Sequence, residues 1–235
     1  MTSLETPDTE TVTGTWRRLR GLARGAGVVP ALTALRTAVC PEALPCGPAG
    51  HALVPEDIAE TFDHGWADGS GAPRAADRED RLTEIAVSGG VLVALRRRDE
   101  APVDVHRAPV RAWTLGLAWV RLGLSEQMLD TCMTYLRGRV TGAGTLLNQQ
   151  MVKGSLAEVA IEHLEIETMM DGALPGDLDI AATVHLHAQI TRADRMLLRL
   201  LGAYGFLADG PGQVAWVSEL LADVYVGPPA EGGPR

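Results

Sequence analysis

The stretch RLLGAYGF, residues 199–206, places a cation, two glycines and two aromatic side chains at the end of a long apolar segment. Gly202 and Gly205 permit positive φ and close approach of another group, because glycine has no Cβ. Arg199 carries a planar guanidinium that suits a phosphate, and Arg139 in the stretch RVTGAG is a second such cation. Taken alone, the pattern predicts a glycine helix stop with aromatic side chains in the core.

Three other side chains have the chemistry to hold or move a proton: His163, Tyr135 and Tyr204. His163 lies on the apolar side of an expected helix, a position typical of a hydrogen-bonded core histidine, and a buried histidine is also a competent acid or base. Together with Trp113 and Trp216, these residues predict a cleft that positions a bound chain and donates hydrogen bonds to it.

A metal site is not predicted. Cys40, Cys46, His51 and His64 have the spacing C-x5-C-x4-H-x12-H. Structural zinc sites bring their ligands in close C-x2–4-C and H-x3–5-H pairs, and neither pair occurs here. Two reduced thiols beside a proline-rich loop account for the same residues.

The composition excludes several classes of protein. A net charge of −9 argues against an extended nucleic-acid surface. No uncharged apolar run reaches the roughly 18–20 residues that span a bilayer. The first twelve residues are acidic and polar, unlike a targeting peptide, and three cysteines do not make a disulfide framework. We therefore expect a cytoplasmic protein with neither nucleic acid nor membrane as a partner.

The elements that must position these side chains fall into two regions. Residues 1–105 contain short helical patterns, a loop over 67–80 and two β-like runs over 83–97 that meet at Gly89-Gly90. The last feature is typical of a β-hairpin. Residues 228–235 have the composition of a flexible tail.

Residues 108–227 contain four helical patterns with short connections, over 109–138, 146–171, 178–201 and 211–225. Short connections between long amphipathic helices are typical of antiparallel neighbours. The predicted fold class is mainly α, an up-and-down four-helix bundle with a smaller N-terminal helical region that includes the hairpin.

In the 108–227 region four motifs resemble, in the same order and spacing, those of the C-terminal helical domain of acyl-CoA dehydrogenases. The matching stretches are Gly123-Leu124 with Leu129-Asp130 and Tyr135, the stretch from Arg139 to Gln150, residues 199–206, and Val224-Tyr225-Val226-Gly227. The resemblance implies oxidation of an acyl thioester with FAD as cofactor. It also implies cofactor contacts at Arg139, Arg199, Gly202, Ala203 and Gly205, with the turn facing the FAD of a neighbouring subunit.

The sequence departs from this family at the residues that do its chemistry. Val226 stands where most members have the carboxylate that removes the α-proton, and valine cannot accept a proton. Other members carry this carboxylate on the first bundle helix. It is missing there too, because no Asp or Glu occurs between Arg107 and Ser125. Ala203 replaces the second glycine of the turn, and 105 residues are too few for the family's two preceding domains. These changes argue against retained FAD and ordinary dehydrogenase activity, and they leave open whether the protein is an enzyme.

Several functions remain open. In the first, a shortened acyl-CoA dehydrogenase-like protein binds an acyl thioester or polyketide-like chain for non-redox chemistry such as cyclisation or isomerisation, with His163, Tyr135 and Tyr204 as candidate catalytic residues. In the second, the chain is a non-catalytic partner subunit of a heteromeric FAD-dependent acyl-CoA dehydrogenase. A helical scaffold and an intact flavin enzyme with its base elsewhere are the others. We expect a homodimer through residues 178–201 and 211–225, or a hetero-oligomer with an acyl-CoA dehydrogenase-like subunit.

Overall fold

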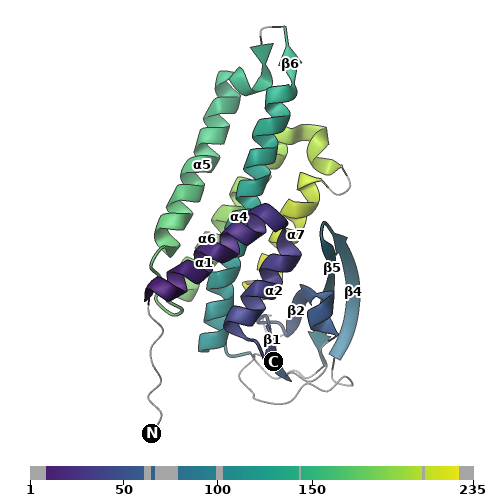
Figure 1. Cartoon of the computed structure of the whole chain (residues 1–235), viewed down its shortest axis with the longest axis vertical. Coiled ribbons are helices and arrows are strands. Elements are labelled where there is room, and N and C mark those ends of the chain that lie inside the picture. Colours follow the sequence, from purple (N-terminus) through teal and green to yellow (C-terminus); the bar gives the residue numbers. More distant parts are fainter. Residues whose placement is uncertain are drawn as a thin grey trace, which may run out of the picture.

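A computed structural model describes residues 9–60, 65–66, 79–98, 103–142, 144–207 and 210–227. Four long helices run alternately up and down and form the expected bundle (Figure 1). They are α4 (Ala108–Gly138), α5 (Gln150–Met170), α6 (Ile180–Leu201) and α7 (Pro211–Tyr225). The mainly helical fold class is confirmed.

Local sequence signals fix where these helices begin and end. Asp179 caps α6, because its side chain accepts a hydrogen bond from the backbone N–H of Ala182 at 2.6 Å. The same helix ends at Gly202, whose φ of 55° favours glycine. Pro211 opens α7 at a position where its missing N–H costs nothing. The turn after α6 is a short 3-10 helix, η3 (Gly202–Phe206).

Two N-terminal helices, α1 (Thr9–Ala26) and α2 (Val28–Val39), pack directly on α4. In Figure 1 the purple α1 crosses the bundle at α4. Trp16 and Leu35 from these helices lie in the same hydrophobic cluster as Trp113 and Leu117 of α4. The N-terminal region and the bundle therefore share one core.

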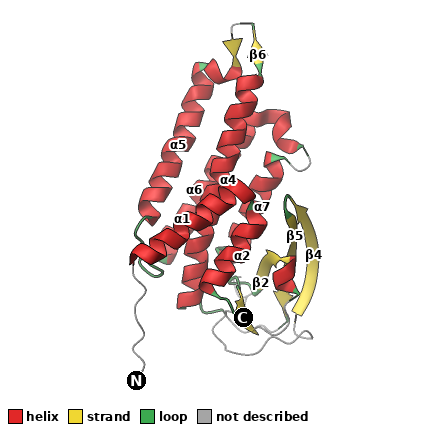
Figure 2. Cartoon of the chain, viewed as in Figure 1, coloured by secondary structure: helices red, strands yellow, loops and turns green. Residues whose placement is uncertain are grey.

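A small antiparallel sheet lies against the lower end of α7 (Figure 2). Its strand order is β2 (His51–Pro55), β5 (Gly90–Arg97), β4 (Glu79–Val87). Strands β4 and β5 form a hairpin at the expected turn, with Val87 paired to Gly90. Tyr225 joins the sheet to α7, because its hydroxyl donates to the carbonyl of Leu53 and accepts from the N–H of Leu53.

The remaining elements are short: α3 (Glu56–Ala59), η2 (Leu146–Asn148), a parallel pair β1 (Ala43–Leu44) and β3 (Gly65–Trp66), and an antiparallel pair β6 (Val140–Thr141) and β7 (Gly144–Thr145). The predicted loop over 67–80 lies outside the described residues except at 79 and 80, which begin β4 and correct that boundary. The predicted tail, 228–235, lies outside them as well. Within the described residues, no helix combines the length and hydropathy that crossing a bilayer requires.

Candidate functional site

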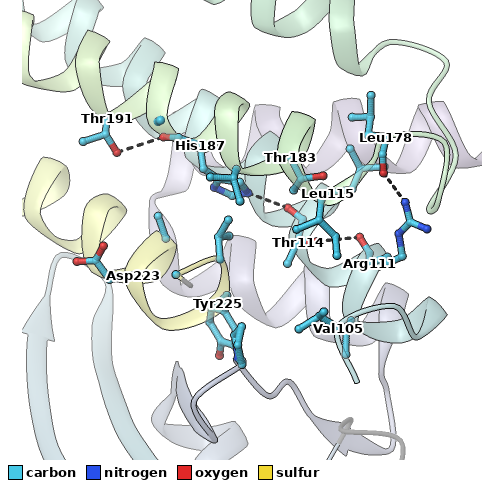
Figure 3. A pocket seen from close by; sticks show the side chains of 18 of the residues that line it. Val105, Arg111, Thr114, Leu115, Leu178, Thr183, His187, Thr191, Asp223 and Tyr225 are labelled. Atoms are coloured by element: carbon cyan, nitrogen blue, oxygen red, sulfur yellow. Dashed lines mark hydrogen bonds between the residues drawn. The ribbon is translucent and has the colours of Figure 1, made fainter. Parts of the chain in front are cut away.

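A cavity of about 690 Å³ lies between the first half of α4, the first half of α6 and the second half of α7. Figure 3 shows Thr114, Thr183 and Tyr225 converging on it from these three helices. Most of the wall is apolar, with contributions from Val110, Leu115, Leu178, Ile180, Val184, Ala222 and Val226. Its size and its apolar lining suit a flexible hydrocarbon chain.

Arg111 lines the cavity at one end, and a group of charged side chains lies towards Asp223 at the other end (Figure 3): Arg192, Arg195, Glu219 and Asp223. Arg192 donates to Glu162 at 3.1 Å, and Arg195 pairs with Glu219. Asp223 makes no ion pair within the part of the chain that the structure describes. The cavity therefore has an apolar body and a polar end where one carboxylate is unpaired.

His187 forms part of the wall and leads into a buried polar network. Its Nε2 donates to the carbonyl of Thr114 at 3.1 Å, so its Nδ1 is free to accept from Arg121 Nη1 at 2.9 Å. Burial, with the nearby Arg121 cation, lowers the pKa of His187 to about 3. This ring is fixed as the neutral tautomer and does not serve as a base at neutral pH.

Arg121 is fully buried in the centre of the bundle. Its guanidinium also donates to Ser218 at 3.0 Å and to Thr191 at 2.8 Å. Ser218 in turn donates to Asp194 Oδ2 at 3.1 Å. Burial raises the pKa of Asp194 to about 6, and the positive charge of Arg121 opposes part of that increase. Three helices, α4, α6 and α7, are held together by these bonds.

His163 occupies a different part of the bundle. Its Nε2 lies 2.8 Å from Ser125 Oγ, and only 5% of the residue is exposed. Burial lowers the pKa of His163 to about 4. The interpretation of this residue as a hydrogen-bonded core histidine agrees with that geometry.

At the far end of the bundle the structure brings together Tyr135, Tyr204 and Arg139. The two tyrosine rings stack with their centroids 4.3 Å apart. Arg139 donates to the Tyr135 hydroxyl at 2.9 Å. Ser125, the partner of His163, lies ten positions before Tyr135 on α4, a rise of about 15 Å, so the three candidate catalytic residues do not form one site.

The structure does not bring the residues of the predicted cleft together: Tyr204 lines a cavity of about 340 Å³, Trp216 lines another, and none of the five lines the 690 Å³ cavity. Trp113 is buried against Tyr225, with ring centroids 5.3 Å apart. Trp216 is 53% exposed and lines a neighbouring cavity of about 370 Å³, which shares Thr191, Arg195 and Glu219 with the larger one. The aromatic residue type alone did not indicate which of these side chains are buried in the core and which line a cavity.

Four of the five residues that the resemblance assigns to FAD lie at the surface. Arg139, Arg199, Gly202 and Ala203 are exposed, whereas Gly205 is buried. A cation and open backbone suit a phosphate group. None of these four exposed residues lines the cavities of about 690, 340 and 370 Å³, so they fit one edge of a cofactor and do not enclose a flavin ring.

Sequence reasoning missed the buried network, although one signal for it was present. Arg121 interrupts the apolar run AWTLGLAWV on the first long helix. A charge inside an otherwise apolar helix indicates a buried partner, because an unpaired buried charge is costly. For metals, no group of three His, Cys, Asp or Glu in the described ranges is placed to hold an ion, and His64 lies outside those ranges.

Comparison with known proteins gives structural matches alone. No protein-family model matches the sequence, and no curated protein sequence matches it. Similar solved structures include butyryl-CoA dehydrogenase from Megasphaera elsdenii, with 12% identity over 80% of this chain and 60% of that chain at a TM-score of 0.50. Acyl-CoA dehydrogenase from Geobacillus kaustophilus shares 16% identity over 67% of this chain and 48% of that chain, at a TM-score of 0.49. The ChsE4-ChsE5 complex from Mycobacterium tuberculosis shares 21% identity over 62% of this chain and 44% of that chain, at a TM-score of 0.48.

This chain therefore spans 44–60% of the length of the three matched structures. The match to butyryl-CoA dehydrogenase shows that the fold is acyl-CoA dehydrogenase-like. At such low identity the likeness concerns the fold and carries no activity with it.

Proposed function

We propose that this chain, whose fold is acyl-CoA dehydrogenase-like, binds an acyl thioester or polyketide-like chain and acts on it without redox chemistry, as a cytoplasmic protein. The observation that supports this is the 690 Å³ cavity, which has an apolar body and borders Val226. Val226 belongs to the stretch that resembles the family's base motif. A pocket that keeps its place beside this stretch and lacks the usual base favours binding and positioning over dehydrogenation.

Isomerisation needs no electron acceptor, and the polar end of the cavity offers the groups for it. Asp223 would take a proton from the α-carbon of a bound β,γ-unsaturated thioester, and the electron pair would delocalise onto the thioester carbonyl. The same proton would then return at the γ-carbon, which moves the double bond and restores the carboxylate. The hydroxyl of Thr191 donates to the carbonyl of His187 at 3.2 Å in the free chain, and it would have to turn towards the ligand to donate to the developing oxyanion.

Binding is tested with octanoyl-CoA as the probe, by calorimetry on the full chain. We expect Val184→Trp to abolish binding, because this residue lines the cavity and a tryptophan would fill it. Arg137→Trp is the matched control, since Arg137 is exposed at the distant end of α4. Equal affinity of the two variants would overturn the placement of the ligand.

Catalysis is tested separately, by NMR in D2O with a β,γ-unsaturated N-acetylcysteamine thioester. Exchange of the α-proton is expected with the wild-type protein and not with Asp223→Asn. Binding without exchange would refute the proton-transfer step and leave the binding proposal intact.

A second candidate is a partner subunit of a heteromeric FAD-dependent acyl-CoA dehydrogenase. The observation that favours it is an exposed apolar patch beside the η3 turn, in which Phe206 is 78%, Leu207 56% and Trp216 53% exposed. Such a patch is typical of a surface that another chain covers. Co-expression with a full-length acyl-CoA dehydrogenase-like chain tests it: the complex should carry flavin absorbance, and Trp216→Glu should prevent its assembly. If neither candidate survives, a scaffold role remains.

A further inference from the structure

The cavity of about 370 Å³, here called the η3 cavity, lies between α6 and α7 on the side of the 690 Å³ cavity that faces η3. The two cavities share three wall residues, Thr191, Arg195 and Glu219. Arg195 of α6 pairs with Glu219 of α7, so this ion pair joins the two helices where the cavities meet. A ligand held at Thr191 can therefore extend into both cavities.

Asp194 is a buried polar side chain in the wall of the η3 cavity. It is 2% exposed, and its Oδ2 accepts a hydrogen bond from Ser218 at 3.1 Å. Burial raises the pKa of this carboxyl and the nearby Ser125 hydroxyl lowers it, but that hydroxyl lies 2.8 Å from His163 Nε2. The other oxygen, Oδ1, has no hydrogen-bond partner among the residues that the structure describes. A buried acceptor without a donor is costly, so Oδ1 suits a donor that a ligand supplies.

The rest of the η3 cavity wall combines apolar and polar side chains. Leu198, Ala215 and Trp216 are apolar, and Gln213 is polar. Pantetheine, the thiol arm of coenzyme A and of carrier proteins, alternates amide groups with methylene and methyl groups. It therefore matches this mixed wall, and each amide brings an N–H that can donate. A hydrocarbon chain in the same place would leave the Asp194 carboxylate oxygen without a donor.

We infer that the η3 cavity receives the pantetheine arm of the bound thioester, and that Asp194 Oδ1 accepts a hydrogen bond from the first amide N–H of that arm. The inference rests on the proposed thioester binding, with the carbonyl at Thr191. Three positions separate Thr191 from Asp194, a rise of about 4.5 Å on one side of α6. Two C–S bonds, one C–C bond and one C–N bond separate the thioester carbonyl carbon from that nitrogen, a span of about 5 Å. The two spans match, so Asp194 selects the thiol side of the ligand.

Two thioesters that differ at one position test the hydrogen bond. S-octanoyl-N-acetylcysteamine carries the amide, and in its ketone analogue a methylene group replaces the N–H. In calorimetry on the full chain, we expect the amide to bind at least about tenfold more tightly, because a hydrogen bond to a buried charge has that strength. Val184→Trp should abolish the binding of both, since Val184 lines the 690 Å³ cavity.

The outcomes separate this inference from the proposed function. Equal affinity of the wild type for the two ligands, with Val184→Trp still abolishing binding, overturns the role of the η3 cavity and leaves the acyl site in place. The absence of binding by either ligand overturns both.

Asp194→Asn tests the residue itself. Ser218 accepts from Arg121 and donates to Oδ2, so the asparagine carbonyl should take the Oδ2 position and its NH2 group the Oδ1 position. An NH2 group cannot accept the N–H of the ligand, so the preference should fall to about twofold or less. Glu158→Gln makes the same chemical change at an exposed position of α5 outside both cavities, and it should keep the preference. A preference that Asp194→Asn retains overturns the inference.

The source of the arm is identified with octanoyl-CoA and octanoyl-pantetheine. Tighter binding of octanoyl-CoA identifies the free coenzyme, because only that ligand carries the nucleotide. Equal affinities identify a carrier protein as the source, since the arm alone then makes the contacts.

Asp194→Asn also removes a negative charge beside the buried Arg121, so circular dichroism must verify that the variant folds. If it does not fold, NMR of the wild-type protein with an isotope-labelled N-acetylcysteamine thioester provides the test. Nuclear Overhauser effects from the ligand amide proton to the methyl groups of Leu198 and Ala215 are expected. Effects to Val110 and Leu115 instead would place the amide in the 690 Å³ cavity and overturn the inference.

Discussion

Two helix faces in this molecule have similar sequence patterns and opposite surroundings. On α4, Gly116 and Gly123 lie seven residues apart and α1 and α2 cover them. A Cβ on Gly123 would lie 2.3 Å from the carbonyl oxygen of Arg20, and one on Gly116 would lie 2.3 Å from Leu35 Cδ1. On α5, Gly154 also begins a row with a 3/4 spacing, yet a Cβ there would meet nothing within 4 Å. The two rows differ in what covers them, which the pattern itself does not encode.

The largest expected difference lies within α5, between its buried side (Leu156, Val159, His163, Ile166 and Met170) and its exposed side (Gly154, Ala157, Ile161, Leu164 and Thr168). Ile166 is completely buried and Ile161 is 55% exposed. We expect Ile166→Ala to lower the free energy of unfolding by about 2–5 kcal/mol, because it leaves a cavity in a packed core. Ile161→Ala should change it by less than about 0.5 kcal/mol in the monomer. Urea denaturation at low protein concentration measures both, and equal losses would mean that the exposed side of α5 is covered within a single chain.

The buried side of α5 should also make stability depend on pH, through His163. Its pKa is about 4 in the folded chain, against about 6.5 when unfolded. The unfolded state therefore binds a proton first as the pH falls, so this group removes about 3 kcal/mol of stability between pH 6.5 and pH 4. Glutamine at this position keeps a hydrogen bond to Ser125 and does not titrate, so His163→Gln should flatten the profile in that window.

The control variant for this pH dependence is His185→Gln, since His185 is exposed on α6. Thermal melts from pH 7 to pH 4 measure all three proteins. His187 and Asp194 contribute equally to each, so the difference between variants isolates His163. A His163→Gln profile that matches the wild-type profile would contradict the burial of this ring.

Alanine substitutions at Gly123 of α4 and Gly154 of α5 compare the covered helix face with the exposed one most directly. Gly123→Ala should destabilise the chain by about 1–3 kcal/mol, because the added methyl meets backbone of α1 that cannot move aside cheaply. Gly154→Ala should stabilise the monomer by about 0.5–1 kcal/mol through helix propensity. Both glycines are inside helices, so the intrinsic gain is the same and the opposite signs come from the surroundings. If Gly123→Ala is also stabilising, α1 does not lie on α4 as the structure has it.

The sequence predicted the parts of the fold that depend on local periodicity and punctuation. The four long helices and the hairpin at Gly89-Gly90 lie where apolar spacing and turn residues indicate them. The site is different, because its residues come together only through tertiary packing. The local pattern does not predict that Trp113 packs against Tyr225, or that Val226 and Thr183 line the same cavity. Arg121 is the exception, because a charge in an apolar run already requires a buried partner.

The smallest expected difference concerns charge. Arg20 joins three helices, since it donates through Nε to Glu126 of α4 at 2.9 Å and also pairs with Glu167 of α5. Glu126 is 8% exposed, so Arg20→Met would leave a nearly buried carboxylate whose remaining contact is Arg24 at 3.9 Å. We expect a loss of about 1–2 kcal/mol, most of it the desolvation cost of that carboxylate.

The double variant Arg20→Met/Glu126→Gln should recover much of this loss, because it removes the stranded charge as well as its partner. Lys153→Met supplies the contrast, because Lys153 is exposed on α5; its effect on the monomer should be within about 0.5 kcal/mol. Chemical denaturation of the four proteins at one pH measures the set. A failure of the double variant to recover stability would show that Arg20 acts by packing α1 against α4 and α5 and that its charge contributes little.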